Sequence, residues 1–155
     1  MVIQDGYETL SEASQRKTGW KLGVGYEFLT RADGLPGLID TYHLPLDGTP
    51  RSMDLGLLYQ ALKQKQVDMV AGSSTDGLIS ALGLKALRDD KSYFPPYEAA
   101  LAIRPRADPN FRQALLELSG KISTDQMRQL NYQVDSQHRP VRAVAKAFLD
   151  NLTRQ

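Results

Sequence analysis

The chain has 155 residues, of which 41% are hydrophobic and 24% are charged, and this is the size and composition of one ordinary folded domain. The formal net charge is +1 and no dense basic stripe is present, which argues against nucleic-acid binding. Cysteine is absent, which excludes disulfides and thiolate chemistry, and no apolar run approaches the ~20 residues that span a bilayer.

Residues 1–103 alternate short strand patterns with helical patterns, which is typical of an α/β domain with a mostly parallel sheet. Helices are predicted at 9–14, 36–42, 55–62 and 78–82. In the third of these, Leu55, Leu58 and Leu62 recur at helical spacing behind Asp54, a favourable N-cap residue. Strands are predicted at 20–28, 51–53, 67–71, 84–87 and 97–103.

Three further helices are predicted in the remainder of the chain. Asp108 and Pro109 are an N-cap and an N1 proline that open the first of them. Ser123 and Gln126 match the capping box at the start of the second. The third begins at Pro140 and carries apolar side chains along one side. The chain is therefore expected to end in a helical segment.

Candidate catalytic and metal-binding groups do not combine into a site in the sequence. His43 and His138 are the only histidines, and neither stands in a metal-ligand spacing. Ser73 and Ser74 do not lie in the frame of a nucleophile elbow. The G-V-G at 23–25 lacks the remainder of a phosphate-binding loop and is interpreted as a strand edge. We therefore expect no enzyme, no metal site and no cofactor.

Arg31 is the first candidate binding residue. It follows the carboxyl end of the predicted strand 20–28, where open α/β sheets place their ligands. Its planar guanidinium can bind a carboxylate through two parallel hydrogen bonds. The alternative is a surface ion pair with Asp33, and the residues alone favour neither interpretation.

A run of polar side chains, Ser73, Ser74, Thr75 and Asp76, is the second candidate. It follows the predicted strand 67–71 and opens the next predicted helix. Hydroxyl groups and the N–H groups of a helix N-terminus suit polar or anionic ligand atoms. The alternative is simple capping of that helix, which the residues alone favour.

The third candidate is the aromatic segment YFPPY at 93–97, which ends in Tyr97. Rigid prolines that present aromatic rings suit a cage for a cation, because the face of an aromatic ring is electron-rich. The alternative is ordinary packing of the rings in the core, which the residues alone favour. The preceding pair Asp89-Asp90 is interpreted as a solvated surface turn.

These segments, in this order, resemble the osmoprotectant-binding proteins of ABC importers, a family that binds glycine betaine, choline or carnitine. RADGLPGL at 31–38 matches the family pattern R-x-D-G-[LF]-P-G-L, and LRDDKSYFPPY at 87–97 matches L-x-D-D-[KR]-x-[FY]-F-P-P-Y. The resemblance runs from about Thr9 to Leu152, which is nearly the whole chain.

The resemblance implies a lobe of the periplasmic-binding-protein type II fold, in which two α/β lobes trap the ligand between them. Residues 1–103 would be the second lobe, and 104–155 would be a helical segment that completes the first lobe. On this resemblance, most of the first lobe would not be in this chain. Because the C-terminal helices would normally pack on that lobe, we expect them to repack on the lobe that is present or to contact another chain.

Site residues are also implied by the resemblance. Arg31 matches the arginine that grips the ligand carboxylate, and Tyr97 matches one wall of the aromatic cage around the quaternary ammonium. Thr75 and Asp76 match the turn beside that cage. Ser73 is a departure, because relatives often place an aromatic cage residue there, and its loss removes a cation–π contact of roughly 0.5–2 kcal/mol.

The implied function is solute binding for an ABC importer, without chemistry. The ligand, a quaternary ammonium compound or zwitterion, would stabilise the closed form, which would then dock on a permease. Such a protein is periplasmic or otherwise extracytoplasmic, and its signal peptide is not in this chain. The alternative is a ligand-sensing module of the same fold within a larger regulatory or permease-fused protein.

Overall fold

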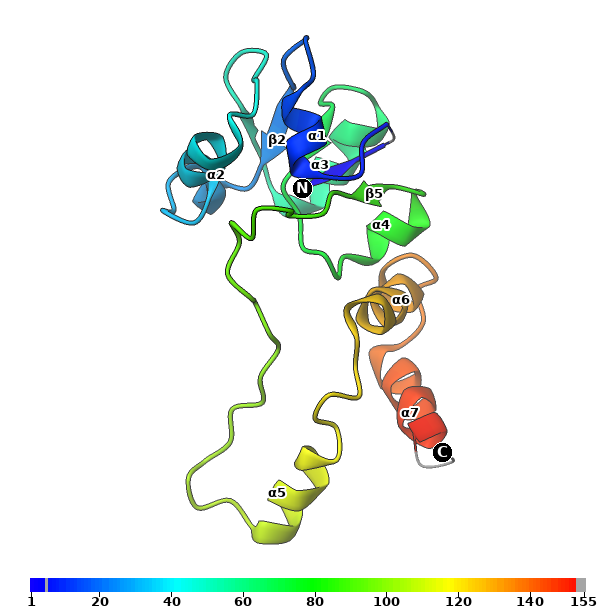
Figure 1. Ribbon diagram of the computed structural model, residues 1–155. Coiled ribbons are helices and arrows are strands. Elements are labelled where there is room, and N and C mark those ends of the chain that lie inside the picture. Colours follow the sequence, from blue (N-terminus) through cyan, green and yellow to red (C-terminus); the bar gives the residue numbers. More distant parts are fainter. Residues whose placement is uncertain (5, 153–155) are drawn as a thin grey trace.

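The computed structural model describes residues 1–4 and 6–152, and within them five short strands form one sheet (Figure 1). β2 is parallel to β3 and β4, whereas β1 is antiparallel to β4 and β5, so four of the five strands share one direction. The predicted α/β class with a mostly parallel sheet is confirmed. In spatial order, the strands are β3 (Arg51–Ser52), β2 (Leu22–Val24), β4 (Met69–Val70), β1 (Val2–Ile3) and β5 (Lys85–Ala86).

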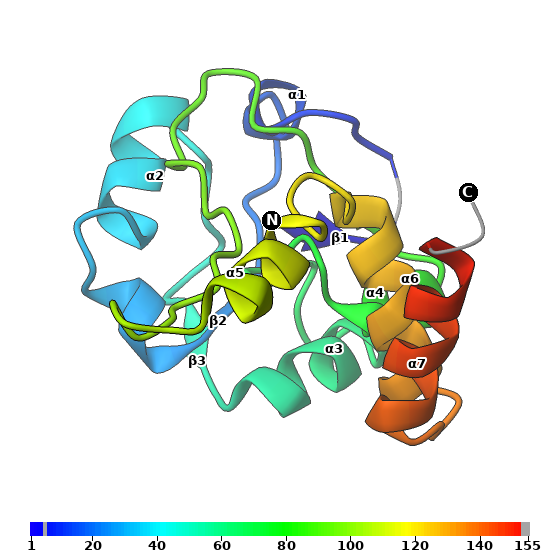
Figure 2. The ribbon, with the colours of Figure 1, turned by 90° about the horizontal axis from the view of Figure 1, so that it is seen from below.

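Helices cover both faces of the sheet, because apolar residues point from both of its sides. Ile3 and Met69 belong to the core beneath α1 (Leu10–Ser14) and α2 (Leu35–Tyr42). Their strand neighbours Val2 and Val70 belong to a second core beneath α3 (Leu55–Lys63) and α4 (Gly77–Ala81). Figure 2 shows β2 between α2 and α3.

The structure corrects the predicted strands at three places. The strand predicted at 20–28 ends at Val24, and the chain then forms a 3-10 helix, η1 (Tyr26–Leu29). β1 was not predicted, because a strand of two residues is too short to show a periodic pattern. The strand predicted at 97–103 is wrong. Its residues are almost all exposed, and no strand lies beside them in the described part of the chain to pair with their N–H and C=O groups.

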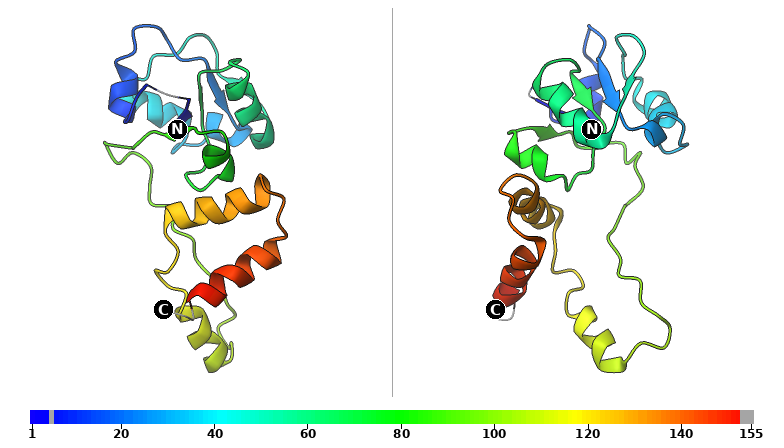
Figure 3. Two further views of the ribbon diagram at one scale, coloured as in Figure 1. Left: turned by 90° about the vertical axis from the view of Figure 1, so that its right-hand side faces the viewer. Right: turned by 180° about the vertical axis from the view of Figure 1, so that it is seen from behind.

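All three predicted C-terminal helices are present. They are α5 (Pro109–Leu116), α6 (Thr124–Asp135) and α7 (Val141–Leu152). The Asp108 carboxylate caps α5 by accepting from two backbone N–H groups, and the predicted capping box of Ser123 and Gln126 opens α6. α6 packs on α4 of the lobe and α7 packs on α6, whereas α5 stands away from the lobe at the end of an extended stretch (Figures 1 and 3).

The C-terminal segment keeps large apolar side chains on its surface. Phe111 and Leu116 of α5 are 55% and 59% exposed, and Val141 of α7 is 66% exposed. The predicted segment 104–155 reaches beyond the described residues at 153–155. No described helix is both long enough and apolar enough to cross a membrane.

Candidate ligand-binding site

One broad groove collects most of the predicted binding residues. Arg31, Ser73, Ser74, Thr75 and Tyr97 all line it. Its lobe side is formed where the chain leaves β2, β3 and β4, which is the carboxyl edge of the parallel strands. Open α/β sheets bind ligands at this edge, so the groove is the candidate site.

Arg31 is held by a short network of exposed side chains. Its Nε and Nη2 atoms donate to the two carboxylate oxygens of Asp33 at 2.9 and 2.6 Å. Nη2 also donates to the Tyr97 hydroxyl at 3.0 Å, and that hydroxyl donates to Asp33. The ion pair between Arg31 and Asp33, one of the two interpretations of the sequence, is therefore formed. The structure also brings Arg31 and Tyr97 into direct contact, although 66 positions separate them.

The network changes the acid–base behaviour of its members. Hydrogen bonds from Arg31 and then from Tyr97 hold the pKa of the Asp33 carboxyl well below its usual range. The hydrogen bond to Asp33 raises the pKa of the Tyr97 hydroxyl. At neutral pH the site therefore presents a guanidinium, a carboxylate and a neutral phenol.

The turn at 73–76 is stabilised from within by Asp76. Its Oδ2 atom accepts from the Ser73 N–H at 3.0 Å and from the Tyr59 hydroxyl at 2.5 Å. Asp76 stands at the N-cap position of α4, but its side chain does not cap that helix, so the simple capping alternative is wrong for this residue. Instead the carboxylate ties the turn to α3, and the Ser73 and Thr75 hydroxyls lie 3.0 Å apart on the groove side.

Tyr59 and Gly72 make this arrangement possible, and neither was predicted from the sequence. A Cβ atom at position 72 would collide with the Tyr59 hydroxyl, so a larger residue there would displace that hydroxyl from its place beside Asp76. Burial, and next the hydrogen bond to Asp76, raise the pKa of Tyr59. The signal for Gly72 was present, because a glycine that directly follows a strand often marks a close approach.

The aromatic segment divides its roles. Tyr93 and Phe94 are partly buried and pack against the core, as the packing alternative requires, with their rings 4.8 Å apart. Tyr97 is 65% exposed and lies at the groove. The Tyr93 hydroxyl donates to the Gly34 carbonyl at 2.7 Å, so this ring clamps the loop that carries Arg31.

Asp89 is not the solvated surface residue that the sequence suggested. It is half-buried, and its carboxylate accepts from the N–H groups of Tyr93 and Phe94 at 3.0 and 2.7 Å and from the Tyr42 hydroxyl. Aspartate is common at turns because its carboxylate can accept from nearby backbone N–H groups, so the residue type was the signal that was available. Asp89 thereby fixes the start of the segment that ends in Tyr97.

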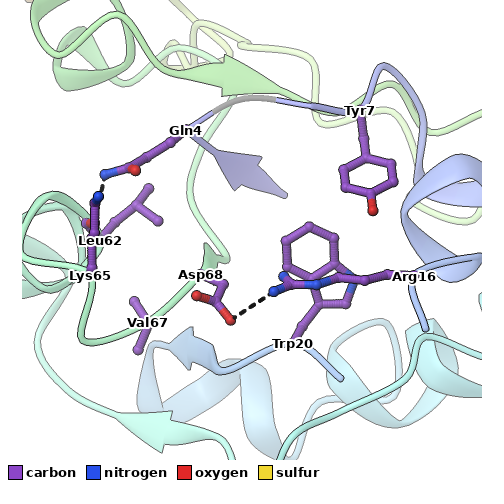
Figure 4. A pocket seen from close by; sticks show the side chains of 8 residues that line it. All are labelled: Gln4, Tyr7, Arg16, Trp20, Leu62, Lys65, Val67 and Asp68. Atoms are coloured by element: carbon purple, nitrogen blue, oxygen red, sulfur yellow. Dashed lines mark hydrogen bonds and ion pairs between the residues drawn. The ribbon is translucent and has the colours of Figure 1, made fainter. Parts of the chain in front are cut away.

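A second pocket, of ≈ 380 Å³, lies at the opposite edge of the sheet (Figure 4). The Arg16 guanidinium lies 4.1 Å above the centroid of the Trp20 ring and pairs with Asp68 at 3.5 Å. The Arg16 guanidinium therefore covers the face of the Trp20 ring, whereas that of Arg31 stays 6.0 Å from the centroid of the Tyr97 ring. Within the described residues, no cluster of histidine and acidic side chains could hold a metal ion.

Comparison with known proteins identifies the family of the chain. The family described as the substrate binding domain of ABC-type glycine betaine transport systems matches residues 1–151. A carnitine transport binding protein of Listeria monocytogenes is 45% identical, over 96% of this chain and 51% of that protein. An ergothioneine transport permease/ergothioneine binding protein of Helicobacter pylori is 32% identical, over 94% of this chain and 27% of that protein.

A solved structure shares the fold and covers most of the chain. The crystal structure of a glycine betaine/carnitine/choline ABC transporter superposes with a TM-score of 0.79 at 32% identity, over 97% of this chain and 58% of that one. The present chain spans about half the length of the Listeria relative.

Proposed function

The chain belongs to the family of substrate-binding domains of ABC-type glycine betaine transport systems, and we propose that it forms one side of a compatible-solute site in such an importer. This is a transport family rather than an enzyme family. The observation that carries the proposal is one groove, at the carboxyl edge of the sheet, that Arg31, Tyr97 and the hydroxyls of the 73–75 turn all line.

Arg31 would bind the carboxylate of a zwitterionic ligand. Asp33 takes the Nε and Nη2 donors, while Nη1 donates to no residue in the described part of the chain. An Nη1 donor is therefore available to a ligand carboxylate without breaking the pair with Asp33. The ring of Tyr97 would face the quaternary ammonium, and the Ser73, Ser74 and Thr75 groups would bind further polar atoms.

On the lobe formed by this chain, the proposed aromatic cage for the ammonium lacks a ring at position 73. Ser73 is exposed and offers no ring face, which removes roughly 0.5–2 kcal/mol of cation–π attraction. The remainder of the site would come from a first lobe, to which residues 104–155 would also contribute. Ligand held between two lobes would favour the closed form, and that form would dock on a permease outside the cytoplasm.

Calorimetry and NMR titration of this chain with glycine betaine, carnitine and choline test the proposal. We expect dissociation constants well above the micromolar range, with amide shifts confined to the loop of Arg31, the turn 73–76 and the neighbourhood of Tyr97. The Arg31→Ala variant should bind glycine betaine and carnitine more weakly, because both carry a carboxylate. Its binding of choline, which has no carboxylate, should be unchanged. The Arg51→Ala variant is the matched control, because Arg51 is also exposed but lies outside the groove.

Two results would contradict the proposal. One is a set of ligand-induced shifts around Trp20 rather than at the groove. The other is an equal loss of choline and betaine binding in the Arg31→Ala variant, because that would remove the carboxylate from the argument. Micromolar binding by this chain alone would contradict the need for a first lobe.

Self-association through the C-terminal helices is part of the proposal. Exposed Phe111, Leu116 and Val141 leave apolar surface that drives association when nothing covers it. Sedimentation velocity should show an oligomer whose population rises with concentration, and Phe111→Ser should shift it to monomer. A monomer at all concentrations, with a tail readily cut by proteases, would count against this.

A permease-fused protein is the second candidate, and one observation favours it. The Helicobacter relative is described as both a permease and a binding protein, and the present chain matches 27% of its length. The intact mass of the native protein, detected with an antibody against this chain, distinguishes a separate receptor from a fusion. A mass close to that of a two-lobe receptor excludes the fusion.

A further inference from the structure

Helix α6 lies directly against the turn at 73–76, and we infer that Arg128 and Asn131 of α6 are positioning residues that hold this turn in its shape. The inference rests on the proposed function only in treating the turn as part of a ligand site. It links the C-terminal helical segment to a site that sequence reasoning assigned to the lobe alone.

Two hydrogen bonds from α6 reach consecutive carbonyls of the turn. Arg128 Nε donates to the Ser74 carbonyl at 2.8 Å, and Asn131 Nδ2 donates to the Thr75 carbonyl at 2.8 Å. Because a peptide group is planar and trans, fixing these carbonyls toward α6 turns the N–H groups of Thr75 and Asp76 the other way. Those N–H groups in turn bond to Ser73, at its Oγ and carbonyl oxygen respectively.

Arg128 is itself held in place for this contact. Its Nη1 atom pairs with Asp125, one turn earlier on α6, at 3.1 Å, and its side chain is only 21% exposed. The guanidinium therefore has little freedom, and it presents Nε to the Ser74 carbonyl from a fixed direction.

The close approach of α6 depends on the glycine that follows the turn. A Cβ atom at Gly77 would lie 2.5 Å from the Tyr132 nitrogen and 2.6 Å from the Asn131 carbonyl carbon, both of which are backbone atoms of α6. Only glycine lets the helix come near enough for the side chain of Asn131 to reach Thr75. The helix and the turn thus fit each other through backbone contact as well as through side chains.

A contact elsewhere on α6 provides the internal control. Gln129 Nε2 donates to the Ser80 hydroxyl at 3.4 Å, which lies within α4 and away from the turn. Loss of this contact removes a bond between α6 and α4 but none to the carbonyls of the turn. It therefore separates general docking of α6 from positioning of the turn.

Amide hydrogen exchange, measured by NMR on the complete 155-residue chain without ligand, tests the inference. In Arg128→Met and in Asn131→Asp at pH 7, the amides of Thr75 and Asp76 should exchange about fivefold faster, since each change removes one hydrogen bond to a carbonyl of the turn. Gln129→Ala should leave both amides within twofold of the wild type. Circular dichroism verifies that each variant stays folded.

Two further variants distinguish positioning from simple destabilisation. Arg128→Lys keeps a donor, so it should recover part of the protection. In Asn131→Asp, the introduced carboxyl repels the Thr75 carbonyl when ionised, but it can donate to it when protonated at about pH 4. Protection relative to Gln129→Ala at the same pH should therefore return on acidification.

Equal exchange at the turn in Arg128→Met, Asn131→Asp and Gln129→Ala would overturn the inference, whether all three are fast or all are slow. Loss of protection in Asn131→Asp that does not recover at low pH would overturn it as well. A glycine betaine titration of the wild type is read separately. Absence of shifts there would refute the proposed ligand site, whereas the exchange comparison still decides the inference.

Discussion

Gly77→Ala is the perturbation whose effect follows most directly from the structure. The added Cβ would lie 2.5 Å from an α6 backbone nitrogen, whereas ordinary Cβ contacts begin at 3.4 Å, so α6 must retreat by about 0.9 Å. Overpacking of this kind costs about 1–3 kcal/mol. Removing a glycine from the unfolded chain returns about 0.4–1 kcal/mol. We expect a net loss of roughly 1–2 kcal/mol in the free energy of unfolding.

Urea denaturation followed by circular dichroism measures this loss, and Gly56→Ala is its matched control. Gly56 is also helical, lies in α3, and would place its Cβ in open space. This control should gain about 0.4–1 kcal/mol, so the two alanine variants should move in opposite directions. If Gly77→Ala proves as stable as the wild type, α6 does not pack on α4 in solution as the structure shows.

Other changes have equally direct outcomes. Tyr59→Phe should lower the free energy of unfolding by about 1–2 kcal/mol in urea, because the partly buried Asp76 carboxylate loses a donor. The folded-state pKa of Tyr59 is raised above its ordinary value of 10.0, chiefly by burial, so stability that is complete below pH 10 should fall as the pH rises beyond it. In Tyr59→Phe, the free energy of unfolding should fall less at alkaline pH than in the wild type. If its pH profile matches that of the wild type, Tyr59 is not the cause of the alkaline loss. Ser73→Tyr should tighten choline binding about 2–30-fold in an NMR titration if position 73 faces the ammonium. Tyr93→Phe removes the hydrogen bond to the Gly34 carbonyl, so amide hydrogen exchange around Gly34 should become faster. Amides of helix α6 should stay protected.

Much of the fold was accessible from local sequence signals. Two C-terminal helices, α5 and α6, were predicted from their caps, the Asp108-Pro109 start and the capping box of Ser123 and Gln126. Each cap acts through hydrogen bonds two or three residues away, so its signal is local. The strand at 97–103 failed for the complementary reason. Its residues favour an extended backbone, but a strand forms only beside another strand, and sequence spacing does not supply that neighbour.

The candidate site divides in the same way. The residue types of Arg31, Tyr97 and the 73–76 turn, together with their resemblance to a known family, predict a zwitterion site. The role of Tyr59 was missed because its partner, Asp76, lies in a turn 17 positions further along the chain. The role of Asp89 was missed although Tyr93 and Phe94 are only four and five positions away, because two acidic residues followed by a lysine suggested a solvated turn.

The sequence by itself determined the periodic elements, the polar turns that follow the strands, and the chemistry available at each of them. Only the tertiary structure decided that Arg31 meets Tyr97 across 66 positions and that Arg128 reaches the turn at Ser74 across 54. The physical reason is the range of the interactions. Helix caps and turns close within a few residues, so their spacing is written in the chain. Contacts between distant segments exist only after the sheet has stacked its loops along one edge and a glycine at position 77 has admitted α6.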